Sequence, residues 1–88
     1  MLQVAITTDT AMPIEIGNSP DALFELGMIY SSGRLGVIDL IAAHKWFNLA
    51  AVRGRADAVA LRREIAEMMS EAEVAQAQRE ARAWMTTH

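Results

Sequence analysis

Hydrophobic positions recur at three- and four-residue intervals through most of the chain, the spacing that places side chains along one face of an α-helix. Between these runs stand short connections that contain glycine or serine. The pattern predicts four helices, at about residues 20–32, 39–53, 56–68 and 70–85. We therefore expect an all-α fold made of two stacked antiparallel helical hairpins.

Capping residues support three of these starts. Ser19 precedes Pro20 and Asp21, so a serine cap, a proline in the first turn and an acidic residue near the positive helix end occur together. Asp39 is placed to cap the second helix. Ser70 and Glu73 have the spacing of a capping box, in which each side chain accepts a hydrogen bond from the other residue's amide.

The first eighteen residues have a different pattern. Two short stretches, 2–6 and 14–16, alternate between apolar and polar residues, which is typical of extended structure. We expect residues 1–18 to form an N-terminal arm that is either poorly ordered or packed on the helices. Residues 19–88 are then one helical domain, because 88 residues leave no room for a second core.

The first two predicted helices carry a characteristic set of residues: Leu26, Gly27, Tyr30, Gly33, Asp39, Ala43, Trp46, Ala50, Ala51 and Gly54. In type and spacing this set resembles the Sel-one-like repeat, a relative of the tetratricopeptide repeat. The resemblance covers one full repeat, about residues 20–55, and part of a second. It implies a tetratricopeptide-like αα-hairpin in which these residues are structural. The pattern does not resume after residue 60, so we expect the last two helices to act as a cap.

Some packing can be predicted without the family. Gly27 lies in mid-helix, which costs about 1 kcal/mol unless another group packs closely against it. We expect the ring of Trp46 to fill that place. Trp46 and Phe47 are about 100° apart on a helix, so they must contact different partners. We also expect Met68, at the end of the third helix, to face the core.

Composition excludes several classes of function. The chain has no cysteine, which removes disulfides and thiol chemistry and fits a cytoplasmic protein. Charged residues interrupt its most apolar region, so we expect no membrane span. His44 and His88 are the only imidazoles, and neither has a nucleophile or further metal ligands at a suitable spacing. We therefore expect no enzyme activity, no cofactor and no metal.

The family resemblance implies a protein–protein interaction module. In such hairpins the first helix lines the groove, so Phe24, Glu25, Met28 and Ile29 are the candidate partner contacts. Helical repeats bury their apolar faces against neighbours, and three or more are usually required for stability. One and a half repeats therefore leave two possibilities. Either the last helices close the stack, or an apolar face remains for another protein, a peptide or a second copy of the chain.

An arginine cluster offers an alternative. Arg53, Arg55, Arg62 and Arg63 surround the junction between the second and third predicted helices. They are candidates for binding an acidic partner or a nucleic-acid backbone. The net charge of −3 and the lack of nearby aromatic residues make nucleic acid the weaker of these two partners.

Overall fold

The computed structural model describes residues 19–88, which form four helices and no strand. This confirms the predicted all-α fold, and each helix boundary lies within two residues of its expected position. The N-terminal arm predicted over residues 1–18 lies outside the described residues. No helix in the described part is long and apolar enough to cross a bilayer. The helices are α2 (Pro20–Ser32), α3 (Leu40–Val52), α4 (Asp57–Ala66) and α5 (Glu71–Thr87).

The predicted caps are present. The side chains of Ser19 and Asp39 each accept a hydrogen bond from the amide three residues further on, both at 3.0 Å. At the start of α5, Ser70 Oγ accepts from the Glu73 amide at 3.1 Å, and Glu73 Oε1 accepts from the Ser70 amide at 2.9 Å. Gly33 ends α2 with a φ of 75°, which suits glycine. These contacts are local, so local sequence signals were sufficient to predict them.

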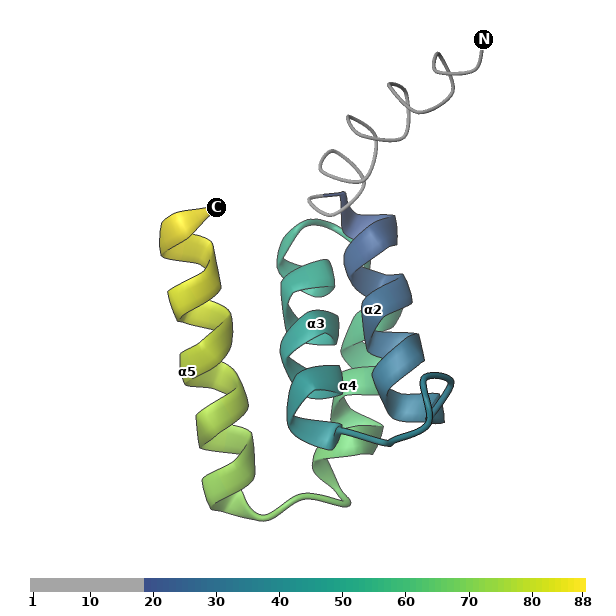
Figure 1. The fold of residues 1–88 in the computed structure, drawn as a ribbon. Helices are drawn as coiled ribbons and strands as arrows, with labels where there is room; N and C mark the ends of the chain where they lie inside the picture. The colour runs from purple at the N-terminus through teal and green to yellow at the C-terminus, as the bar shows by residue number, and fades with distance from the viewer. Residues whose placement is uncertain (1–18) are drawn as a thin grey trace, which may run out of the picture.

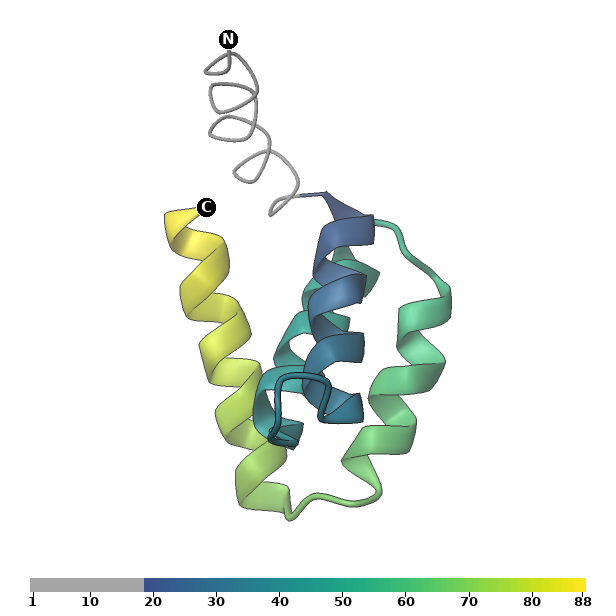
Figure 2. The same ribbon diagram turned by 45° about the vertical axis from the view of Figure 1, so that its right-hand side comes forward.

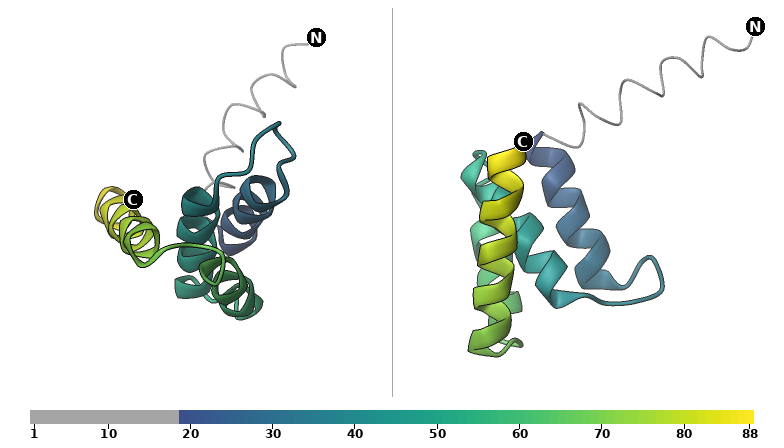
Figure 3. Two further views of the ribbon diagram at one scale, coloured as in Figure 1. Left: turned by 90° about the horizontal axis from the view of Figure 1, so that it is seen from below. Right: turned by 60° about the vertical axis from the view of Figure 1, so that its left-hand side comes forward.

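The central helix of the fold is α3. Helices α2, α4 and α5 all pack against it, and Figure 3 shows α3 between α5 on one side and α2 and α4 on the other. Every residue of α3 from Leu40 to Ala51 is buried or half-buried. The side chains of α3 therefore serve three neighbouring helices, where the offset of Trp46 and Phe47 predicted at least two different partners.

The two helix pairs differ in their packing. Helices α2 and α3 form the expected antiparallel hairpin, with the most extensive contact between any two helices (Figure 1). Helices α4 and α5 instead separate from the connection that joins them and pack on different sides of α3 (Figure 2). The second expected hairpin is thus open, since α4 and α5 each pack on α3 more than on each other.

The core combines a few large side chains with many small ones. Phe47, Leu23 and Leu49 are its largest fully buried residues. The rings of Phe24 and Phe47 meet edge to face, with centroids 5.5 Å apart. Alanines at the helix contacts allow close approach of the helices. Those with no exposed surface are Ala43, Ala50, Ala58, Ala77 and Ala81.

Phe47, and not Trp46, lies against Gly27, so the expected contact is corrected. A Cβ atom on Gly27 would lie 2.5 Å from two ring atoms of Phe47. Trp46 points to the other side of α3, where it meets Trp84 of α5 edge to face at 5.6 Å. The 100° offset between the two aromatics was predictable, but which of them faces α2 depends on how the helices are arranged.

Met68 also differs from its expected position. It is 66% exposed, because α4 ends at Ala66 and Met68 falls in the turn that follows. The helical periodicity that would place it on the core face no longer applies there. Ala58 and Ile65, which lie within α4, are buried as the periodicity predicts.

Candidate functional site

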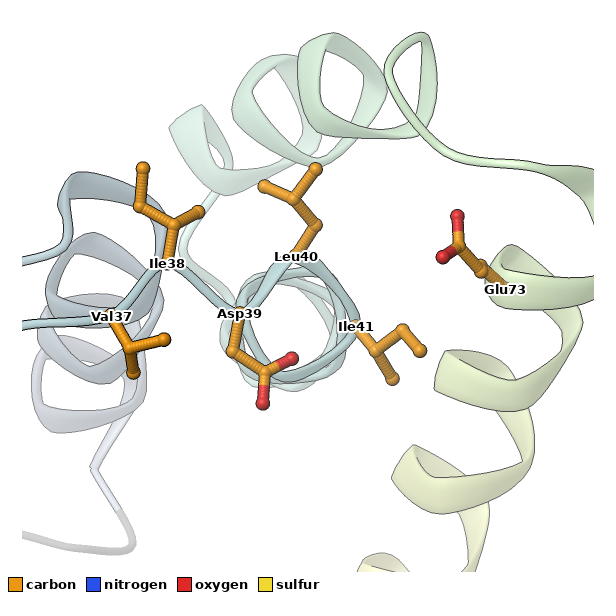
Figure 4. Close-up of a pocket in the computed structure, with 6 residues that line it drawn as sticks. All are labelled: Val37, Ile38, Asp39, Leu40, Ile41 and Glu73. Atoms are coloured by element: carbon orange, nitrogen blue, oxygen red, sulfur yellow. The ribbon is translucent and has the colours of Figure 1, made fainter.

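A depression of about 360 Å³ lies where α3 begins (Figure 4). Side chains from the α2–α3 loop, the first turn of α3 and the first turn of α5 line it. In Figure 4, Val37 and Ile38 stand on the α2 side of α3, while Ile41 points toward α5 and Glu73. We call this site the loop-end surface, and its residues are Val37, Ile38, Asp39, Leu40, Ile41 and Glu73.

Large apolar side chains are exposed at and beside this surface. Leu35, Val37 and Ile38 are 69%, 62% and 58% exposed, and they are three of the six large apolar side chains that the described residues expose. Burying such a side chain completely is worth about 1.5–3 kcal/mol. A cluster of them on a loop is therefore a common mark of an interaction site.

The loop itself is tightly closed. Gly33 and Gly36 both have positive φ, 75° and 98°, and the Gly36 amide donates to the Gly33 carbonyl at 2.9 Å. The Asp39 amide then donates to the carbonyl of Tyr30 at 3.0 Å, which joins the end of the loop to α2. The loop backbone is thus held by its own hydrogen bonds, and the exposed side chains stand on a defined support.

Two carboxylates border the apolar residues. Asp39 and Glu73 are both exposed, and each uses one oxygen to cap its helix. The capping bonds hold these carboxylates at the edge of the depression. The loop-end surface therefore combines apolar side chains with fixed negative charge.

The groove residues predicted on α2 have different environments. Phe24 is half-buried against Phe47, and the guanidinium of Arg55 lies 3.8 Å from its ring centroid. Glu25 is exposed and forms an ion pair with Arg34 at 2.7 Å. Met28 and Ile29 are half-buried. Phe24 is thus occupied within the fold, which leaves less of α2 open to a partner.

Arg55 connects the starts of α2 and α4. It donates two hydrogen bonds to Asp57, at 2.8 and 3.2 Å, and one to Asp21 at 3.0 Å. The hydrogen bond with Asp57 is the largest cause that raises the pKa of Arg55 above its ordinary value. This arginine is therefore engaged by acidic groups of its own chain.

The other three arginines of the cluster point to different places. Arg53 lies over the ring of Trp84, 5.4 Å from its centroid, and Arg62 donates to Asn48 Oδ1 at 2.7 Å. With Arg55 over Phe24, two of the four arginines lie against aromatic rings, so the expected lack of nearby aromatic residues is corrected. Arg63 is exposed on α4. Three of the four predicted arginines thus contact three different helices, α5, α2 and α3. The four arginines belong to α4 and to the connection between α3 and α4, but their side chains extend toward different helices.

His44 is the buried titratable group of the core. It is 3% exposed, and its Nδ1 has no hydrogen-bond partner among the described residues. Burial first, and then the positive charge of Arg62, lower the pKa of His44 below its ordinary value of 6.5. The imidazole is therefore neutral at neutral pH. Within residues 19–88, no three His, Asp or Glu side chains are grouped so that they could hold a metal ion.

This histidine predicts a pH dependence of stability. The unfolded chain takes up a proton at His44 near pH 6.5, whereas the folded chain resists it until a lower pH. The contribution of His44 to the free energy of unfolding is thus fully present above pH 6.5 and is lost as the pH drops below it. Urea unfolding of His44→Leu between pH 7.5 and 5.5 should show a smaller fall than the wild type. If the free energy of unfolding fell equally in the wild type and His44→Leu but fell less in His88→Ala, the assignment of this pH dependence to His44 would be contradicted.

The comparisons identify no relative. No protein-family model, curated protein or solved structure matches the chain significantly. The Sel-one-like resemblance thus remains an interpretation of its residues. Sequence reasoning did not single out the loop-end surface. The available signal was the presence of Leu35, Val37 and Ile38 in the connection between Gly33 and the Asp39 cap, where polar residues are usual.

Proposed function

We propose that this protein is a non-enzymatic protein-interaction module built around one Sel-one-like helical hairpin. The observation that carries the proposal is the loop-end surface, where exposed Val37 and Ile38 border a depression of about 360 Å³. The ordered helices supply a rigid support for it. In this proposal α4 and α5 act as the cap that covers the remaining sides of α3.

The loop end is better suited to a partner than the groove side of α2. Phe24 is already covered by Phe47 and Arg55, and Glu25 is paired with Arg34. A partner on α2 would have to displace these contacts before it gained new ones. At the loop end the apolar side chains have water as their neighbour, so their burial adds directly to binding.

Site-specific photo-crosslinking in the native cell tests the proposal. A photoreactive amino acid at position 37 should give discrete crosslinked products with another protein. The same amino acid in place of Gln78, an exposed residue of α5, should give none, because Gln78 does not line the loop-end surface. Gel shifts followed by mass spectrometry identify the products.

Ile38→Lys is the variant that connects the products with the surface. Ile38 is 58% exposed, so the change places a charge on the apolar patch with little effect on the fold, which circular dichroism can check. We expect the crosslinked products from position 37 to disappear. Equal products from positions 37 and 78, or none from position 37, would count against the proposed function.

A further inference from the structure

We infer that the loop-end surface binds a segment of another protein in which apolar side chains stand next to lysine or arginine. This inference rests on the proposed function and adds the chemistry of the partner. Its basis is the charge around the apolar residues. Interfaces select partners by electrostatic complementarity, so the sign of the charge at the rim indicates the sign required of the partner.

Carboxylates dominate this end of the molecule. Asp39 and Glu73 line the depression. Glu67 and Glu71, both exposed, stand at the end of α4 and the start of α5, which lie at the same end of the fold (Figure 1). The two helix ends that line the depression are both N-terminal, those of α3 and α5. Each N-terminus carries the equivalent of about half a positive charge, so a full carboxylate charge at each leaves the depression negative.

Two of the cations on neighbouring segments are already engaged, while Arg63, in the last turn of α4, is exposed and does not line the depression. Arg34 in the α2–α3 loop forms its ion pair with Glu25 at 2.7 Å. Lys45 lies one turn further along α3, with its ammonium 4.4 Å from the ring centroid of Trp46. Neither residue lines the depression. The carboxylates of Asp39 and Glu73 thus remain to meet a cation from outside.

Charge also distinguishes between the possible occupants. Residues 1–18 of this chain carry Asp9 and Glu15 and no lysine or arginine, so they would bring like charge to the surface. A second copy of the chain has a net charge of −3 and would present its own carboxylates if two loop ends met. A basic, apolar segment of a different protein avoids both repulsions.

The apolar residues and the two carboxylates of the loop-end surface are close enough to contact one segment of a partner. Val37, Ile38, Leu40 and Ile41 surround the first turn of α3, and Glu73 faces Ile41 from α5 (Figure 4). A partner can place apolar side chains on this floor while a neighbouring lysine or arginine reaches a carboxylate at the edge. The apolar contact supplies affinity, and the charge selects the sequence.

Titration with synthetic peptides tests the inference. The probe is a short peptide with leucines and lysines in a helical pattern. Its two controls replace the lysines with glutamates or the leucines with serines. We expect the leucine–lysine peptide to shift the NMR signals of residues 37–41 and Glu73. Both controls should bind at least about tenfold more weakly, because each lacks one of the two contributions.

Two double variants distinguish the effect of the carboxylates at the depression from the effect of the net charge of the protein. Asp39→Asn with Glu73→Gln removes both rim charges but keeps side chains that cap helices. It should weaken binding of the leucine–lysine peptide about five- to tenfold, the size expected for two exposed ion pairs. Glu64→Gln with Glu80→Gln makes the same change in net charge away from the depression and should change binding less than about twofold.

The inference is overturned if the two pairs of variants weaken binding equally, if the leucine–glutamate peptide binds as well as the leucine–lysine peptide, or if no signals of the loop-end surface shift. The crosslinking experiment separates this failure from that of the proposed function. Products from position 37 whose contacting peptide is acidic, or belongs to a second copy, would overturn only the inference. Absence of products from position 37 would remove the proposed function as well.

Discussion

Replacement of Phe47 by alanine is expected to lower the free energy of unfolding by about 3–5 kcal/mol. The ring is 1% exposed and packs against Gly27 and Phe24, so its removal leaves a cavity between α2 and α3. Domains of this kind have a total stability of roughly 5–15 kcal/mol. The variant should therefore lose a large part of its stability, as urea or thermal unfolding followed by circular dichroism can show.

Val52→Ala is the matched control for this change. Val52 is also on α3 but is 60% exposed, so its truncation should alter stability by no more than about 0.5 kcal/mol. If Phe47→Ala lowered the free energy of unfolding as little as Val52→Ala, the ring would not occupy the core between α2 and α3. The described packing of the first hairpin would then be incorrect.

Gly27→Ala is expected to destabilise the protein by about 2 kcal/mol, although alanine is the better helix former by about 1 kcal/mol. The new Cβ would lie 2.5 Å from Cδ1 and Cε1 of Phe47, so α2 and α3 would have to move apart or the ring would have to leave its position. Chemical unfolding of the variant measures the effect. A gain in stability would mean that α2 does not approach the ring closely.

Two backgrounds identify the residue that Gly27 contacts. In a Phe47→Leu background the smaller side chain should reduce the cost of Gly27→Ala, because the two sites interact directly. In a Trp46→Leu background the cost should be unchanged, since Trp46 faces Trp84 on α5. The opposite pattern of coupling would restore Trp46 as the neighbour of Gly27.

The candidate binding residues were less predictable than the helices. Sequence reasoning selected α2 positions and an arginine cluster from their types, but exposure and pairing depend on distant residues. Arg55, for example, is held by Asp21, which lies 34 positions away in the chain. No local pattern reports such a contact. The apolar loop residues Leu35, Val37 and Ile38 could have been noticed, but their exposure depends on the closed loop conformation.

The sequence by itself determined the number of helices, their approximate ends and their caps, because these depend on residues within about four positions of each other. It also determined that α3 must be packed on more than one side, since the neighbouring residues Trp46 and Phe47 point in directions about 100° apart. Only the tertiary structure decided that Phe47 faces Gly27 and Trp46 faces α5. It also decided that α4 and α5 pack on different sides of α3, and that an apolar, acidic surface remains where α3 begins. The physical reason is that helical periodicity specifies which residues share a face, whereas the helix that covers each face depends on how all the apolar surfaces are buried together.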